Sequence, residues 1–240
     1  MERIITYENL RCFCYTNDKL LTEPPRGMVI DFMGLGGSVM HSDDPAQSVR
    51  LAQEGIIHVI PYANPWNWMN PAAVRFADEL LAALRTHYTL PEDFPFVSCG
   101  GSMGGLCSLI YTRYAAVTPV ACVANCPVCD LPFHYTERPD LPRTLYSAFY
   151  HYECSLQEAL KSASPLDLVD KMPTASQYCV FHCEEDKSVN KQQHSDRFVA
   201  AMQKKHRILY HAVPGRGHCD LTDDMRELYY RHIETAILEA

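Results

Sequence analysis

The sequence feature that most constrains the fold is the glycine-rich stretch that contains Gly100, Ser102 and Gly104. It follows an apolar run over 94–98 and precedes a helical pattern over 103–116. A Gly-x-Ser-x-Gly motif between a strand and a helix is typical of a tight turn that holds the serine hydroxyl above the edge of a sheet. The two glycines remove Cβ atoms where the strand and the helix cross closely. We therefore predict that Ser102 is an activated nucleophile; the alternative is an ordinary glycine-rich turn.

The rest of the chain alternates between strand-like and helix-like segments from residue 28 onward. Short apolar runs predict strands over 28–33, 56–61, 94–98, 120–125, 177–183 and 207–213. Amphipathic patterns predict helices after Pro45, after Asn70, and over 103–116, 166–171, 191–204 and 223–238. Ahead of them, 3–7 and 10–16 are predicted to form a hairpin. Because parallel strands need crossover helices, the fold class is α/β with a mostly parallel sheet.

The alternation breaks between about residues 130 and 162, where prolines and aromatic residues are frequent. This segment is too long for a plain connection between two elements. We predict that it forms a small, partly helical cap. A chain of 240 residues suits one large α/β domain, so we expect a single domain over 1–240 with this cap inserted in it.

A serine hydroxyl needs a base, usually histidine, and an acid that orients the base. His218 is the candidate base because it lies in a glycine-rich loop after the last predicted strand. Asp186 is the candidate acid because it follows the strand over 177–183, and active sites of open parallel sheets lie at the carboxyl ends of strands. The order Ser102, Asp186, His218 is that of α/β-type hydrolases. Three other acids in similar positions stay open: Glu184, Glu185 and Asp130.

These motifs resemble the α/β-hydrolase superfamily, in the serine esterase and prolyl-oligopeptidase-like branch that includes dienelactone-hydrolase-like proteins. The resemblance covers nearly the whole chain and rests on Gly100-Gly101-Ser102-Met103-Gly104-Gly105, Ser164-Pro165-Leu166, His182-Cys183-Glu184-Glu185-Asp186-Lys187-Ser188-Val189 and Gly217-His218. It implies a mostly parallel sheet of about eight strands flanked by helices, with a helical cap insertion. It also implies a triad of Ser102, Asp186 and His218. Dienelactone hydrolases use a cysteine nucleophile, so Ser102 points away from that activity.

The tetrahedral intermediate of acyl transfer needs hydrogen-bond donors for its oxyanion. The resemblance implies the backbone N–H of Met103 as one donor and a backbone N–H in the loop after 28–33 as the other. Members of the family often carry His-Gly in that loop, whereas this chain has Met33 and Gly34. We expect the N–H of Leu35 to be the second donor, with the N–H groups of Gly34 and Gly36 as alternatives. A further alternative is that this loop is only a turn and has no role in catalysis.

Large amphipathic side chains follow two strand ends and are candidates for the wall of a substrate pocket. They are Tyr62, Trp66, Trp68, Phe133 and His134. The alternative is that they pack the cap onto the sheet.

The composition of the chain argues against several classes of binding partner and cellular location. The formal charge of −8 argues against a nucleic-acid partner or an anionic membrane. No apolar run approaches the ~20 residues that a transmembrane helix needs. The first residues lack the basic start and long apolar stretch of a signal peptide. The eleven cysteines show no disulfide framework and are expected to be free thiols in a reducing compartment. We therefore expect a cytoplasmic protein and make no prediction of its oligomeric state.

No cofactor or metal is expected for the chemistry. Cys126 and Cys129 have C-x-x-C spacing, but no second such pair supplies the remaining ligands of a zinc site. A redox role for the pair is the weaker alternative. No histidine pair has the spacing of a metalloprotease motif.

The function that these features predict is hydrolysis of small acyl substrates, above all carboxylic esters, by a serine hydrolase with an acyl-enzyme intermediate. A peptidase or amidase of the same fold is one alternative. A relative that has lost catalysis and binds a ligand or partner is another.

Overall fold

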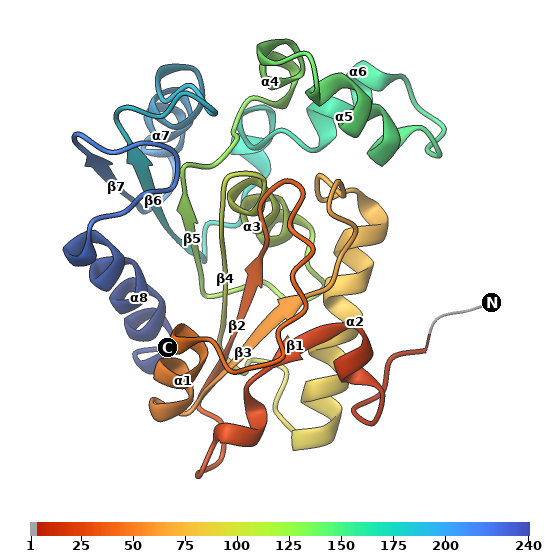
Figure 1. Ribbon diagram of the computed structural model, residues 1–240, viewed down its shortest axis with the longest axis vertical. Helices are drawn as coiled ribbons and strands as arrows, with labels where there is room; N and C mark the ends of the chain where they lie inside the picture. Colours follow the sequence, from red (N-terminus) through yellow and green to blue (C-terminus); the bar gives the residue numbers. More distant parts are fainter. Residues whose placement is uncertain (1–3) are drawn as a thin grey trace.

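In the computed structural model, which describes residues 4–240, one sheet has the strand order β1-β3-β2-β4-β5-β6-β7 (Figure 1). The strands are β1 (Cys14–Thr16), β2 (Gly27–Phe32), β3 (Ile56–Pro61), β4 (Phe96–Gly101), β5 (Ala121–Asn125), β6 (Gln177–Cys183) and β7 (Ile208–Val213). β1 is antiparallel to β3, and all other neighbours are parallel. The α/β-hydrolase fold class is therefore confirmed, with seven strands where about eight were predicted.

Helices cover both faces of the sheet. They are α1 (Ala46–Gln53), α2 (Pro71–Tyr88), α3 (Met103–Tyr114), α4 (Leu131–Glu137), α5 (Leu141–Phe149), α6 (Leu156–Ser162), α7 (Arg197–Met202) and α8 (Asp223–Leu238). One face packs against α1 and α8 through a cluster that includes Leu51 and Ile233, and the other against α2, α3 and α7. Because the central strands are buried on both faces, they read as continuous apolar runs in the sequence. None of the helices in residues 4–240 is long and apolar enough to cross a bilayer.

Most element boundaries agree with the predictions, and side chains cap the starts of the two longest helices, α2 and α8. The side chain of Asn70 accepts a hydrogen bond from the N–H of Ala73 at the start of α2. The predicted helix over 191–204 is instead a π-helical turn, η4 (Gln192–Asp196), followed by α7, and 165–171 is the 3-10 helix η3 (Pro165–Lys171).

The predicted N-terminal hairpin is wrong. The first residue of the predicted hairpin, Arg3, lies outside the described residues. Residues 4–13 contain turns and the 3-10 helix η1 (Leu10–Cys12) in place of a strand. A second 3-10 helix, η2 (Asp18–Leu20), follows β1. The ring of Tyr7 stacks on His87 of α2, with centroids 3.3 Å apart, and its hydroxyl donates to Asp18 at 2.6 Å. The aromatic residues that suggested a strand thus pack against a helix, and β1 pairs with β3 instead.

The helices α4, α5 and α6 lie beyond the carboxyl ends of the strands, at the top of Figure 1. Two side chains that follow β3 fasten them to the rest of the molecule. Nε1 of Trp68 donates to the hydroxyl of Thr144 at 3.1 Å, and Nδ2 of Asn70 donates to the carbonyl of Ala148 at 2.8 Å. This segment covers the edge of the sheet at which β2, β4 and β5 end; its action as a cap stays a prediction.

The packing of α3 onto β2 leaves no room for a side chain at position 104. A Cβ atom on Gly104 would lie 1.9 Å from the carbonyl oxygen of Phe32, and a Cβ on Gly100 would lie 2.6 Å from the same oxygen. Real Cβ atoms do not approach backbone this closely, so the crossing requires glycine at Gly104 of α3 and at Gly100 of the neighbouring strand β4. This contact fixes where α3 begins, directly after Ser102.

We predict that Gly104→Ala lowers the free energy of unfolding by about 3 kcal/mol or more, because the backbone of β2 must shift to admit the methyl group. Urea denaturation followed by circular dichroism measures the change. Gly217→Ala is the matched control, since a Cβ there meets nothing within 4 Å, and it should change stability by less than about 0.5 kcal/mol. Equal urea midpoints for the two variants would contradict the close-crossing argument.

Candidate active site

Ser102 occupies a strained turn between β4 and α3. Its φ of 60° and ψ of −124° are unfavourable for a residue with a side chain, and strain of this kind persists only where the surroundings impose it. Its N–H donates to the carbonyl of Asn125 at 2.9 Å, which ties the turn to the end of β5. Ser102 lines a cavity of about 470 Å³ that His218 also lines.

His218 and Asp186 form a hydrogen-bonded pair at this cavity. Nδ1 of His218 donates to Oδ2 of Asp186 at 2.6 Å. The other oxygen, Oδ1, accepts from the backbone N–H groups of Ser188 at 2.8 Å and Val189 at 3.0 Å. The carboxylate is therefore held on both oxygens, and Nε2, the other nitrogen of the imidazole, lies 3.8 Å from Sγ of Cys219. The structure brings Ser102 to the same cavity as His218 but records no hydrogen bond between the two side chains.

The hydrogen bonds shift both pKa values. Burial alone would raise the pKa of Asp186, but hydrogen bonds from His182, His218 and the N–H of Val189 hold it well below its usual value. Burial alone would lower the pKa of His218, but the hydrogen bond and charge of Asp186, with the nearby Cys126 thiol, raise it to about 9. The pair therefore favours an imidazolium beside a carboxylate at neutral pH.

The other three candidate acids do not reach His218. Glu184 and Glu185 are exposed in the loop after β6. Asp130 caps α4, accepting from the N–H of Phe133 at 3.0 Å, and its other oxygen accepts from Arg197 at 2.7 Å.

Some of the backbone N–H groups that were predicted as oxyanion donors are already hydrogen-bonded, and others are not. The N–H of Gly36 donates to the carbonyl of Pro65 at 3.0 Å, so it is occupied. No hydrogen bond from the N–H of Gly34 or Leu35 to any described residue is found, and both residues line the cavity with Ser102. Met103 is the first residue of α3, where N–H groups have no partner within the helix.

The predicted pocket residues divide between two cavities. Trp68 and His134 line the cavity that holds Ser102. Tyr62 and Trp66 line a separate cavity of about 550 Å³ beside α2 and α5. Phe133 lines neither; its ring packs edge-on against His194, with centroids 5.7 Å apart.

A buried network behind His134 was not predicted. Nδ1 of His134 and Nε2 of His194 both bond to Oε2 of Glu137, the second at 2.8 Å. Nδ1 of His194 accepts from the N–H groups of Cys129 and Asp130 at 3.1 Å, so its Nε2 carries the proton. Burial would raise the pKa of Glu137, but the two histidines lower it to about 2. The i, i+3 spacing of His134 and Glu137 was the one signal in the sequence.

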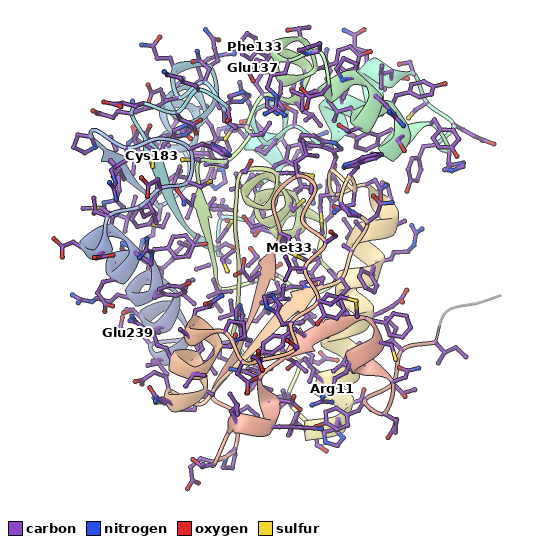
Figure 2. The ribbon with its side chains drawn as sticks, viewed as in Figure 1. Arg11, Met33, Phe133, Glu137, Cys183 and Glu239 are labelled. Carbon is purple, nitrogen blue, oxygen red and sulfur yellow. The ribbon has the colours of Figure 1, made fainter. Side chains whose placement is uncertain are left out.

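Figure 2 places Phe133 and Glu137 together on α4, and Cys183 at the end of β6. His182, the residue before Cys183, is buried and lies 3.4 Å through Nε2 from the carboxylate of Asp186. Its Nδ1 lies 2.6 Å from the hydroxyl of Ser195. In the sequence, His182 is only one member of a longer motif and has no predicted role. The structure places it beside the Asp186 carboxylate.

The C-x-x-C residues do not pair with each other. Sγ of Cys126 accepts from the N–H groups of Cys183 and Cys219, both at 3.4 Å. The thiol of Cys129 instead donates to the carbonyl of Pro127 at 3.6 Å. Cys219, which directly follows His218 and lines the cavity with it, was not predicted as a site residue.

Comparison with known proteins gives the same fold. A family model described as the prolyl oligopeptidase family matches residues 81–235, more than half of the chain. A comparison with curated protein sequences gave no match.

Solved structures resemble the chain over nearly all of its length. Puromycin hydrolase superposes with a TM-score of 0.73 at 16% identity and covers 91% of the chain, which in turn spans only 35% of that protein. A thermophilic esterase from Thermogutta terrifontis superposes with a TM-score of 0.63 at 17% identity, covering 92% of this chain and 83% of its own. Pyrococcus horikoshii acylaminoacyl peptidase gives 0.64 at 12% identity, with coverage of 89% and 37%. At such identities the likeness shows the fold alone.

We predict that His218 titrates with a pKa of about 9 in the folded protein, and that Asp186→Asn lowers this value because the charged partner is removed. NMR titration of the imidazole measures both. The pKa is raised above 6.5, so the pair stabilises the fold fully below pH 6.5 and loses that contribution as pH rises through about 9.

Asp130→Asn is the matched control for this titration, because Asp130 bonds to Phe133 and Arg197 rather than to His218. It should leave the pKa of His218 unchanged. A pKa near 6.5 in the wild-type protein would show that the Asp186 hydrogen bond is not formed in solution.

Proposed function

Because the chain belongs to the prolyl oligopeptidase family, we propose that it is a serine hydrolase that cleaves small carboxylic esters. One observation carries the proposal. Ser102, on a strained turn, shares a cavity with an imidazole whose Nδ1 donates to the buried carboxylate of Asp186. This is the arrangement of nucleophile, base and orienting acid that acyl transfer requires.

In the proposed reaction, Oγ of Ser102 attacks the carbonyl carbon of the ester while Nε2 of His218 takes its proton. Asp186 fixes the tautomer and stabilises the imidazolium. The imidazolium then gives its proton to the alkoxide leaving group, which leaves an acyl-enzyme. Water attacks this intermediate by the same steps. Since only a neutral imidazole accepts the proton, and the pKa of His218 is about 9, turnover should rise as pH approaches that value.

The oxyanion of the tetrahedral intermediate needs two donors, and the unbonded N–H groups nearest Ser102 suit this role. We assign the N–H of Met103, at the positive end of the α3 dipole, as the first. The N–H of Leu35 is the second, since Leu35 lines the cavity and Gly36 is already bonded to Pro65.

The cap decides which acyl groups enter. In this proposal, residues of about 130–162 act as a cap within a single domain over 1–240, and His134 of α4 lines the cavity of Ser102 together with Trp68. A cavity of about 470 Å³ accommodates a small acyl substrate. The Thermogutta terrifontis esterase, which matches most of both chains, supports ester substrates.

A peptidase or amidase activity is the second candidate. The matched family model and the neighbouring puromycin hydrolase and acylaminoacyl peptidase favour it. The chemistry is the same until the leaving group departs. At that step an amine leaving group must receive the proton of His218, whereas the alkoxide of an ester needs less assistance. The two candidates therefore differ in leaving group and not in the residues that act.

We predict that the protein hydrolyses p-nitrophenyl esters of short acids faster than aminoacyl p-nitroanilides. Ser102→Ala should lower kcat by a factor of about 10⁴ or more while the circular dichroism spectrum and unfolding midpoint stay near the wild-type values. A fluorophosphonate probe should label the native protein and not the variant. Faster anilide hydrolysis would favour the peptidase, and a folded protein that neither turns over nor labels would be a binding protein of this fold.

We also predict that Asp186→Asn lowers kcat by about 10³–10⁴, since it removes the acceptor that sets the His218 tautomer. Asp130→Asn should lower it less than about tenfold, because asparagine still caps α4 and the residue does not reach the cavity. Steady-state kinetics with one ester substrate compare the two variants. The reverse ranking would move the acid to the loop after β5.

A further inference from the structure

Two thiols and an imidazole come together beside Ser102. In the described part of the chain, Sγ of Cys126, a ring nitrogen of His218 and Sγ of Cys219 all lie within 4.8 Å of one another. Because Nδ1 of His218 donates to Asp186, the nitrogen that faces the thiols is Nε2, which lies 3.8 Å from Sγ of Cys219. We propose that these three side chains bind Zn²⁺, and that the bound ion inhibits the enzyme.

The spacing suits a tetrahedral ion with one open position. Zinc bonds to thiolate sulfur at about 2.3 Å and to imidazole nitrogen at about 2.0–2.1 Å, which puts neighbouring ligand atoms roughly 3.5–4 Å apart. The separations among Cys126, His218 and Cys219 are at most 4.8 Å, so closing onto the ion needs only small side-chain movements. The fourth position opens toward the cavity that Ser102 lines.

Two of the three ligands already have the hydrogen-bond support that metal sites use. The Asp186 carboxylate accepts from Nδ1 of His218, which directs Nε2 toward the thiols as in a carboxylate–histidine–zinc unit. Sγ of Cys126 accepts two backbone N–H groups, from Cys183 and Cys219, which fix the position of the sulfur. Cys219 lines the cavity, so an ion reaches it and His218 from solvent while Cys126 lies buried behind them.

Three other clusters of such residues in the described part of the chain are less suited. In the cluster of Cys126, His182 and Asp186, the carboxylate already accepts from His218. In the cluster of His134, Glu137 and His194 the imidazole nitrogens bond directly to the carboxylate oxygen, which leaves no space for an ion between them. The cluster of Cys179, His211 and His232 offers a single thiol. Cys126, His218 and Cys219 combine two soft sulfur ligands with one imidazole, which is a donor set that zinc prefers.

Binding involves no oxidation or reduction. Two Zn–S bonds and one Zn–N bond form, the thiols of Cys126 and Cys219 release one proton each to solvent, and the His218 imidazolium releases its Nε2 proton so that the neutral imidazole binds the ion. The inhibition rests on the proposed function: Nε2 is the atom that must take the proton of Ser102, and a metal ion on its lone pair prevents this. The binding itself does not depend on catalysis.

The test uses the full chain with the exposed thiols of Cys12 and Cys154 changed to serine, so that adventitious binding is removed. Co²⁺ is the spectroscopic probe, because thiolate ligation gives charge-transfer bands. We expect one Co²⁺ per chain with these bands, displacement by Zn²⁺, and inhibition of ester hydrolysis that a chelator reverses. Cys219→Ser and Cys126→Ser should each weaken Zn²⁺ binding and inhibition by about tenfold or more.

Cys129→Ser is the matched control, since its thiol is equally buried and belongs to the same C-x-x-C sequence but bonds to Pro127. It should bind and respond as the wild type does. Unchanged Co²⁺ spectra and Zn²⁺ inhibition in both Cys126→Ser and Cys219→Ser would overturn the proposal, as would a wild type that binds no Co²⁺. Co²⁺ binding by a protein that a fluorophosphonate probe does not label even when it is metal-free would uphold the metal site and refute the proposed function.

Discussion

The close crossing of β2 and α3 is the contact on which the site depends. Gly104 brings the first turn of α3 against the carbonyl of Phe32, where even a methyl group would lie within 1.9 Å. Ser102, between β4 and this first turn, has a positive φ of 60°. The loop after β2 carries Leu35, which lines the same cavity as Ser102. The close crossing thus joins the two segments, the serine turn and the loop after β2, that line the cavity.

The Asp186 carboxylate organises the other half of the site. Its two oxygens receive bonds from His218, Ser188 and Val189, and His182 lies beside it. A fully buried carboxylate is costly unless it is hydrogen-bonded, and here the bonds more than offset the burial. The loops after β6 and β7 are thereby held together at one point, so the imidazole is oriented by contacts that form when the sheet forms.

The sequence predicts Ser102, Asp186 and His218 as one site because each follows a strand end, and the carboxyl ends of parallel strands meet at one edge. Their catalytic roles stay a prediction. The sequence could not predict contacts that tertiary packing alone creates. Trp66 and Trp68 are two residues apart, yet they line different cavities, and Trp68 has a positive φ of 43° that its pattern does not reveal. Tyr7 packs on α2 where its β propensity suggested a strand. Glu137 and His194 meet across 57 positions of the chain.

Nε2 of His218 lies near more than one group: the thiols of Cys126 and Cys219, and the cavity that Ser102 lines. A neighbouring carboxylate makes Nε2 more basic, and the same property strengthens its affinity for a proton, for a serine hydroxyl and for a metal ion. An imidazole with no thiols beside it would interact only with a proton or with the serine hydroxyl. The thiols of Cys126 and Cys219 add the third, because they lie within reach of the same lone pair. The residue that we propose as the base for Ser102 is thus also the one through which a metal ion would control it.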